Sequence, residues 1–262
     1  MFRKRKLVPL LFGHFDPASL NAQLWLETSD ISTLYQDSAH TTPVASPNDP
    51  VGAIFNKGSV ADYFVQATAG KRPLYQPYGI HGVGIKFDGV DDVLAGSNAS
   101  SYITTTVGDI MVAGSVTTIT TNETTSYDIN DSFFCDGIGA SGGYIQLSLT
   151  SSSPTMHALN YSGGSHPQNV NYDQAANTPF VALWRHTGGR LYLSVNNSPL
   201  GAGVASAATI SLAHALGFGA DWTPTVYTEM EFMGAIARKT IFDEAELRKM
   251  WTYMGDKVGL SL

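Results

Sequence analysis

Three aspartates grouped around one glycine are the residues whose type and spacing could hold a hard cation. They are Asp88, Asp91 and Asp92, and the glycine is Gly89. Carboxylate oxygens are ligands that Ca²⁺ prefers, but the ion takes roughly 6–8 oxygens, so this group supplies only part of a shell. The alternative is that the aspartates keep a turn solvated, because aspartate is common in turns. The sequence therefore offers a candidate calcium site and indicates no other cofactor.

Two short apolar arms, residues 85–87 and 93–94, must position these carboxylates. An Asp-Gly pair between strand-like arms is a strong hairpin signal, because glycine tolerates the positive φ that tight turns need. We therefore predict a tight hairpin in which Phe87 and Val93 face inward. The three aspartates would then lie together at its exposed tip.

A second acidic pair, Glu229 and Glu231, must be weighed as glycosidase carboxylates. Residues two apart on a strand share one face, with Cα atoms roughly 6–7 Å apart, whereas a retaining glycosidase needs carboxyl groups about 5–5.5 Å apart. No serine-nucleophile, phosphate-loop or dinucleotide motif is present. The histidines show no metal-ligand spacing; they are His14, His40, His81, His157, His166, His186 and His214. We expect no catalytic residues and interpret the glutamates as the solvated face of a strand.

Aromatic residues near expected turns could form a platform for a glycan. Tyr144, Tyr161, Tyr172 and Trp222 lie in or near such turns. Aromatic rings offer an apolar face on which a sugar ring can stack. The alternative is packing, because a domain with a large core buries many of its aromatic side chains.

Charge and cysteine content narrow the class of protein. A net charge of −7 argues against a nucleic-acid partner, because phosphate binding relies on clustered Lys and Arg. Charged residues make up only 14% of the chain, which suits a protein embedded in an assembly. Cys135 is the only cysteine, which excludes an internal disulfide and favours synthesis in a reducing cytosol. No stretch approaches the roughly 18 apolar residues of a membrane span, so we expect no membrane partner.

Residues 1–20 are predicted to form a docking arm, followed by a folded domain at residues 21–262. The arm has an apolar run that includes Leu10 and Phe12, preceded by the basic residues Arg3, Lys4, Arg5 and Lys6. Such a segment needs a partner surface with acidic and apolar patches. A signal peptide fits poorly, because the apolar run is short, is broken by a proline and lacks a cleavage site. The alternative is that residues 10–15 add an edge strand to the domain.

Strand signals recur from Leu24 to Ile236, and one helix follows them. The expected strands are residues 24–26, 51–56, 109–116, 132–136, 143–149, 179–186, 190–196, 214–219 and 227–236. Residues 38–50 and 67–77 are expected to be loops. A capping box at Asp243 and Glu246 opens a segment with apolar residues at helical spacing that ends near Val258. The pattern predicts an all-β sandwich with one C-terminal α-helix packed on its outside.

Six segments carry a resemblance when they are taken in order. They are residues 24–30, 49–52, 66–73, 87–92, 191–196 and 232–236. With the helix that follows, they are similar to the laminin-G-like (concanavalin A-like) domains of tailed-bacteriophage virion proteins, which implies a two-sheet jelly-roll sandwich. The match covers about residue 20 to the C-terminus and rests on strand ends and turns. The chain departs from the family at residues 56–60, where such domains often carry a Lys-Ser-Gly-Asn-Gly type of turn.

The resemblance implies a non-enzymatic structural protein of a bacteriophage virion that exposes a lectin-like domain. It would be a capsid decoration or a tail- or fibre-associated component, synthesised in the host cytoplasm, with other virion proteins or copies of itself as partners. The alternative is a carbohydrate-binding module for adhesion to a host-surface glycan. A glycan-cleaving enzyme fits less well, because the resemblance implies a Glu-x-Asp-x-x-Glu type of motif for that activity. Here the sequence runs Glu229-Met230-Glu231-Phe232-Met233-Gly234, and the motif's third acid is missing.

Overall fold

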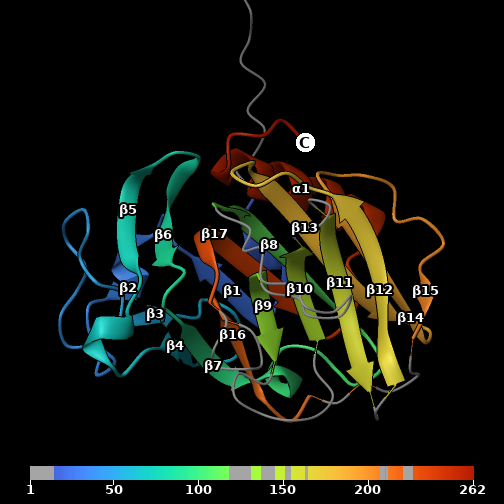
Figure 1. Cartoon of the computed structure of the whole chain (residues 1–262), viewed down its shortest axis with the longest axis horizontal. Coiled ribbons are helices and arrows are strands. Elements are labelled where there is room, and N and C mark those ends of the chain that lie inside the picture. Colours follow the sequence, from blue (N-terminus) through green and yellow to red (C-terminus); the bar gives the residue numbers. More distant parts are fainter. Residues whose placement is uncertain are drawn as a thin grey trace, which may run out of the picture.

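Two antiparallel β-sheets lie face to face and enclose the main apolar core (Figure 1). The computed structural model describes residues 15–117, 131–136, 145–150, 155–162, 165–206, 210, 212–220 and 227–262, and the statements below concern these residues. The predicted all-β jelly-roll sandwich with one C-terminal helix is confirmed. None of the described helices is long and apolar enough to cross a membrane.

The first sheet is organised around a long strand, β17 (Glu229–Arg238). Its strands run in the order β15 (Val204–Ala205), β14 (Arg190–Val195), β13 (Phe180–Thr187), β8 (Gly108–Val116), β17, β6 (Gly82–Asp88) and β5 (Leu74–Gly79). Two strands placed end to end pair with the same edge of β17. Residues 229–232 pair with β6, and residues 234–237 pair with β1 (Leu24–Glu27).

The second sheet contains the remaining strands. Their order is β12 (Ser165–Asp173), β11 (Thr155–Ser162), β10 (Ile145–Thr150), β9 (Asp131–Asp136), β16 (Ala215–Phe218), β7 (Leu94–Asn98), β4 (Tyr63–Val65), β3 (Ala53–Phe55) and β2 (Leu34–Tyr35). Four short 3-10 helices lie in the connections, at Pro17–Leu20, Ile31–Thr33, Ala69–Lys71 and Ala99–Ser101.

The central strand β13 shows how the sequence fills two cores at once. Phe180, Ala182 and Trp184 point into the core between the sheets. Val181 and Leu183 point to the opposite face of the same sheet, where a second core lies. A strand buried on both faces reads as a continuous apolar run, which is why these residues show no alternation in the sequence.

Helix α1 (Glu244–Lys257) covers that outer face and completes the second core. The Asp243 carboxylate accepts from the Glu246 amide at 2.8 Å, and the Glu246 carboxylate accepts from the Asp243 amide at 2.9 Å, so the predicted capping box is confirmed. Met250, Trp251 and Met254 are buried against outward-facing side chains of β8, β13 and β17. The predicted packing of the helix on the outside of the sandwich is therefore also confirmed.

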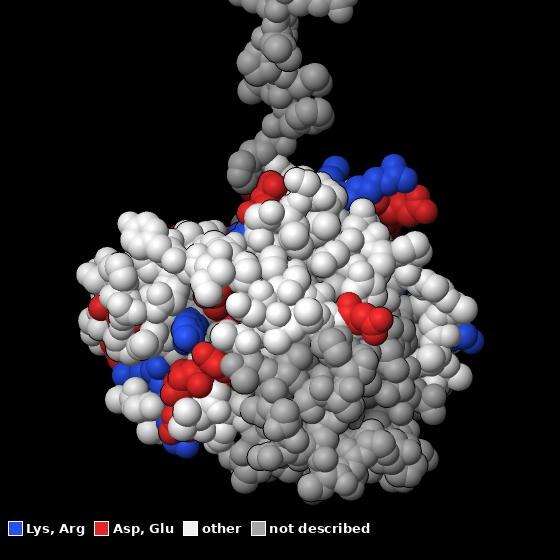
Figure 2. All heavy atoms as spheres, turned by 45° about the horizontal axis from the view of Figure 1, so that its top comes forward, with Lys and Arg blue, Asp and Glu red and all other residues white. Residues whose placement is uncertain are grey.

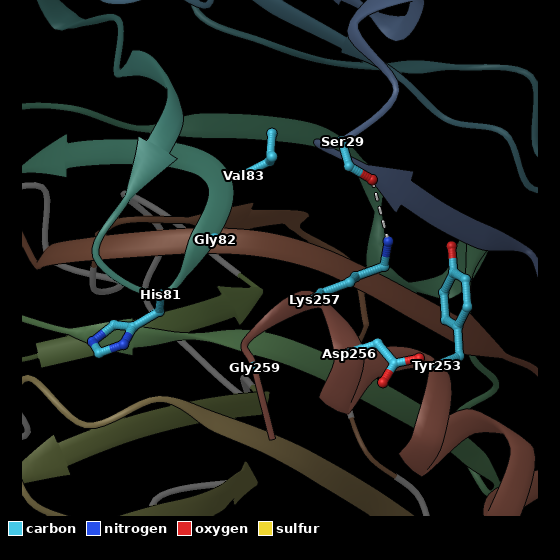
Figure 3. Close-up of a pocket in the computed structure, with 8 residues that line it drawn as sticks. All are labelled: Ser29, His81, Gly82, Val83, Tyr253, Asp256, Lys257 and Gly259. Carbon is cyan, nitrogen blue, oxygen red and sulfur yellow. Dashed lines mark hydrogen bonds between the residues drawn. The ribbon is translucent and has the colours of Figure 1, made fainter. Parts of the chain in front are cut away.

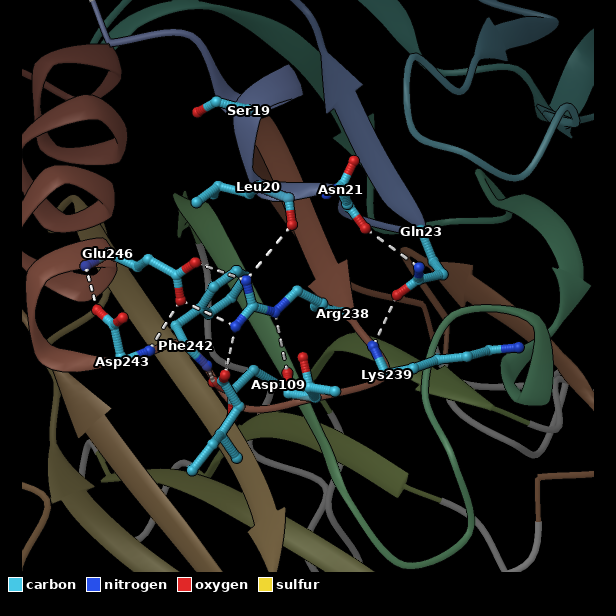
Figure 4. Close-up of polar contacts among 12 residues, drawn as sticks. Ser19, Leu20, Asn21, Gln23, Asp109, Arg238, Lys239, Phe242, Asp243 and Glu246 are labelled. Atoms are coloured by element: carbon cyan, nitrogen blue, oxygen red, sulfur yellow. Dashed lines mark hydrogen bonds and ion pairs between the residues drawn. The ribbon is translucent and has the colours of Figure 1, made fainter.

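Polar contacts fasten the helix and the start of the domain to the first sheet (Figure 4). Arg238 makes two 2.8 Å bonds to the carboxylate of Glu246, and its guanidinium also donates to the Leu20 carbonyl at 3.4 Å. Nearby, the fully buried Asp109 accepts from the Phe242 amide at 2.7 Å. These bonds join β17, α1 and residue 20 into one unit.

Residues 15–20, which the sequence assigned to the arm, lie against the domain. Pro17 and Leu20 are buried, and the Asp16 side chain accepts from the backbone amide two residues later at 2.9 Å. The Phe15 ring meets Tyr253 of α1 edge-on, with centroids 5.9 Å apart. Residues 15–20 therefore belong to the folded domain. The basic and apolar residues of the predicted docking arm lie outside the described residues; they are Arg3, Lys4, Arg5, Lys6, Leu10 and Phe12.

The predicted hairpin around Asp88 and Gly89 is wrong. Its two arms belong to different sheets, because β6 pairs with β17 and β5, whereas β7 pairs with β16 and β4. Phe87 is fully buried as expected, but Val93 is only partly buried. Gly89 does adopt a positive φ of 75°, so the local turn chemistry was correct. Local chemistry could not reveal that the chain crosses from one sheet to the other at this turn.

Two further expectations differ from the structure. The expected loop at residues 67–77 contains the beginning of β5, whose Pro77 and Gly79 weakened the strand signal. Tyr161 and Tyr172 were placed near turns, but they lie in β11 and β12, long paired strands rich in serine, threonine and asparagine. Those residue types are common in turns, so the composition concealed the strands.

Candidate functional site

The three aspartates predicted as cation ligands do converge in space. One ligand oxygen from each of Asp88, Asp91 and Asp92 lies within 4.8 Å of the others. They do not all lie at an exposed tip, however. Asp88 is exposed and Asp91 is intermediate, whereas Asp92 is only 4% exposed. The cluster therefore extends from the exposed carboxylate of Asp88 to the buried carboxylate of Asp92.

Two of these carboxylates also stabilise the turn itself by accepting backbone hydrogen bonds. The Asp92 carboxylate accepts from the Asp88 amide at 2.9 Å, and the Asp88 carboxylate accepts from the Val90 and Asp91 amides at 2.8 and 3.3 Å. Burial raises the pKa of Asp92 to about 6, and the charges of Asp88 and Asp91 add to this rise, against the lowering effect of the Asp88 amide. The fold therefore disfavours the charged form of the Asp92 carboxyl group.

Two lysines bring positive charge close to the cluster. The Lys71 ammonium lies 3.8 Å from Asp91, and the Lys86 ammonium lies 3.3 Å from Glu229, the residue paired with Asp88 across the sheet. Both pairs are partly exposed, so each contributes little to stability. A bound Ca²⁺ would share Asp91 with the Lys71 ammonium and would need further oxygens from water or a ligand.

Two residues of the cluster, Asp88 and Asp92, line a surface groove of about 540 Å³, which we call the Asp88 groove. Its lining residues are Asn48, Pro50, Ala69, Gly70, Arg72, Leu74, Gln76, Lys86, Asp88 and Asp92. Figure 2 shows acidic and basic side chains gathered side by side on one flank of the molecule, while much of the described surface in that view carries few charges. The groove thus combines carboxylate, ammonium and amide groups with a small apolar area.

Long-range backbone pairing assembles this groove. Residues 48–50 run beside β5, because the Asn48 amide donates to the Tyr75 carbonyl at 2.8 Å and the Tyr75 amide donates to the Asp49 carbonyl at 2.9 Å. The side chain of Gln76 then donates to that of Asn48 at 2.7 Å. Sequence reasoning missed both amides, since each lies in a segment expected to be a loop and no local pattern connects them.

The side chains that line the groove differ in exposure and in how many hydrogen bonds they already make within the fold. Arg72 is committed to the fold, because its guanidinium donates to three backbone carbonyls at 3.0 to 3.1 Å. The side chains of Lys86 and Leu74 remain exposed, at 43% and 39% respectively. Together with the exposed Asp88, they present a donor, an apolar surface and an acceptor to whatever enters the groove.

The aromatic residues predicted for glycan binding do not line the Asp88 groove. Tyr172 is half-buried and packs against the main core. Tyr144 and Trp222 lie outside the described residues, as does the side chain of Tyr161. The sequence therefore located the acidic end of the groove, but not its other walls.

The two glutamates considered for catalysis are held separately. Glu231 is only 7% exposed, and its carboxylate accepts from the Ile80 amide at 3.3 Å. Glu229 pairs with Lys86. The expectation that these residues lie on a solvated strand face is wrong for Glu231, because the tip of the β5–β6 hairpin covers it.

Comparisons with known proteins give a likeness of fold alone. No protein-family profile and no curated protein matches the chain. Among solved structures, a Trypanosoma rangeli sialidase with 2,3-difluorosialic acid matches 86% of this chain with a TM-score of 0.57 and 9% identity. The same sialidase with 2,3-difluoro-KDN also matches 86%, with a TM-score of 0.55 and 10% identity. The chain spans only 35% of the sialidase's length in both cases.

A third similar structure is a separate domain. Domain 4 of an extracellular arabinanase from Geobacillus stearothermophilus, in complex with arabinotriose, matches 88% of this chain with 7% identity and a TM-score of 0.49. The match covers 97% of that domain. At these identities the sialidases show a likeness of fold alone, and function must be argued from the site.

Proposed function

We propose that this protein is a non-enzymatic, lectin-like component of a bacteriophage virion that binds a host-surface glycan in the Asp88 groove. The observation that carries the proposal is the groove itself, which is lined by Asp88, Lys86 and Asn48 together with the exposed side chain of Leu74. Sugar hydroxyls donate to carboxylates and accept from ammonium or amide groups, and the apolar face of a sugar ring packs on an aliphatic side chain.

The size of the groove also favours a short glycan. A groove of about 540 Å³ falls within the range of small-ligand sites, roughly 300–1,000 Å³. The fixed turn around Gly89 and the Gln76–Asn48 bond hold its polar groups in place before a ligand arrives. Such preorganisation lowers the entropic cost of binding.

A non-enzymatic role is supported by the state of the two glutamates. Glu231 is buried beneath the hairpin tip, and Glu229 is engaged by Lys86. Neither is among the residues that line the groove. A glycan bound there would meet Asp88 and Asp92, of which Asp92 already accepts a backbone hydrogen bond.

A second role, attachment within a particle, is favoured by the charge distribution. Four of the 15 basic residues stand at positions 3–6, and the first acid is Asp16. From residue 15 onward the chain therefore carries 11 basic and 22 acidic residues. A basic and apolar segment on an acidic domain suits docking onto an acidic, partly apolar protein surface.

Glycan-array binding with the full chain tests the main proposal. We expect binding to a defined set of glycans, at least tenfold weaker in Asp88→Ala and Lys86→Ala and unchanged in Glu244→Ala, an exposed acid on α1. Absence of sugar release from the bound polysaccharide would support the non-enzymatic role, and release would overturn it. Binding to no glycan, or binding unaffected by the groove substitutions, would reject the groove. Failure to find the chain in purified phage particles would reject the virion role.

A further inference from the structure

The tip of the β5–β6 hairpin presents two large apolar side chains to solvent. Tyr78 is 89% exposed and Ile80 is 73% exposed, the highest values among the large apolar residues that the structure describes. Figure 1 shows this hairpin extending beside the end of α1. Exposed aromatic and aliphatic side chains grouped on a projecting element are typical of protein–protein contact sites.

The hairpin tip is held in position by the domain. The Ile80 amide donates to the buried carboxylate of Glu231 at 3.3 Å. Gly82 adopts a φ of 142°, and a Cβ at this position would lie 2.4 Å from the Lys257 carbonyl oxygen, so the tip packs directly on the end of α1. The exposure of Tyr78 and Ile80 is therefore a fixed feature, and a partner would meet a preorganised surface.

A pocket of about 450 Å³ lies between this tip and α1 (Figure 3). Its walls include Val83, Tyr253, Asp256 and Lys257. The Lys257 ammonium is already paired with the buried carboxylate of Glu27, which the Tyr253 hydroxyl also contacts. The exposed carboxylate of Asp256 is therefore the charge left for a partner, so the pocket suits a segment that is apolar and basic.

The chain itself contains such a segment, and it enters the domain beside this pocket. Phe15 packs on Tyr253, which forms one wall of the pocket. The preceding 14 residues hold four basic and several large apolar side chains, namely Arg3, Lys4, Arg5, Lys6, Leu7, Val8, Leu10, Leu11 and Phe12. Fully extended, 14 residues reach about 45–50 Å, enough to cross to a facing molecule.

We infer that residues 1–14 of one copy bind the hairpin tip and adjoining pocket of a second copy. On each copy Phe15, which follows the segment, lies next to the acceptor surface, so two copies that face each other can exchange segments reciprocally. This gives a closed twofold contact, the commonest symmetry of protein oligomers. Tyr78 and Ile80 receive the apolar residues, and Asp256 receives part of the basic run.

Light scattering on two full-length variants tests the exchange. We expect the parent to be a dimer, and both Tyr78→Ser/Ile80→Ser and Leu10→Ser/Phe12→Ser to be monomers with the parent's melting temperature. Val90→Ser is the matched control, because Val90 is 69% exposed on the Asp88 turn, and it should remain a dimer. A monomeric parent, or a dimer that survives both double substitutions, would overturn the inference.

A mixing experiment separates exchange from binding of the segment to its own domain. The tip variant keeps an intact segment, and the segment variant keeps an intact tip, so together they retain one of the two exchange contacts. We expect their mixture to form a heterodimer that neither variant forms alone, with at least tenfold weaker association than the parent. If the mixture stays monomeric and the segment variant melts at a lower temperature, the segment binds its own copy and the inference fails.

Discussion

At the residue scale, the fold repeatedly uses a single polar side chain to organise several backbone groups. Asp92 fixes the turn between the sheets, and Asn56 fixes the turn at residues 56–60. Asn56 is fully buried, accepts from the Trp25 and Gly58 amides, and donates to the Gln23 and Val60 carbonyls and to Asp62. No local sequence pattern revealed this role, because the partners of Asn56 include groups on residues 23 and 25, far away in the chain.

Asn56→Ala should cost about 2–4 kcal/mol of folding free energy, because it leaves several buried donors and acceptors without partners. Urea unfolding measures the loss. Asn98→Ala is a suitable control, since Asn98 is exposed and its side chain makes no capping bond. A loss for Asn56→Ala no larger than that of the control would contradict the assigned role.

Asp92 should make stability fall as the pH rises. Burial raises its pKa in the folded protein from 3.8 to about 6, so the folded state binds the proton more tightly than the unfolded state. The stabilising effect of the proton is fully present below about pH 4 and is lost as the pH rises through about 6. Asp92→Asn should remove this dependence and stabilise the protein at neutral pH by on the order of 2 kcal/mol. Melting curves recorded at several pH values in the presence of a chelator check this pH dependence. If Asp92→Asn were less stable than the parent at neutral pH, the prediction would be wrong.

Calcium should favour the charged forms of the same three carboxylates, whereas the proton favours the neutral form of Asp92. An ion held by Asp88, Asp91 and Asp92 would favour their charged forms, and we expect a modest rise in melting temperature at millimolar calcium. That rise should disappear in Asp91→Asn, while Glu244→Gln, which changes an exposed acid on α1, should keep it. No change in the parent would mean that the aspartates only build the turn.

At the element scale, the second core under α1 gives the helix its stability. Trp251 is 4% exposed and contacts the outward-facing side chains of the first sheet. Trp251→Ala should therefore cost about 3–5 kcal/mol, measured by chemical unfolding. Lys249→Ala, on the exposed face of the same helix, should cost less than about 0.5 kcal/mol. If Trp251→Ala lost less than about 1 kcal/mol, the helix would not depend on this core.

Elements with strong local signals were predictable, whereas their pairing was not. The capping box at Asp243 identified α1, and the apolar runs identified β8, β13 and β17. The groove could not be foreseen, because Asn48 and Gln76 meet only through pairing between distant segments. The hairpin prediction failed for the same reason: an Asp-Gly turn fixes local dihedral angles, and the sheet that receives the next strand is decided by packing elsewhere.

At the scale of the whole molecule, β17 connects the N-terminal segment to the Asp88 groove. β1 follows directly on the segment at residues 15–20 and pairs with residues 234–237 of β17. Further along the same edge, residue 229 of β17 pairs with Asp88 at the groove. A particle pulling on the N-terminal segment and a host surface holding a glycan in the groove would therefore act on the two halves of one edge of β17. Both pairings belong to the first sheet, so β17 would carry the load from one attachment to the other.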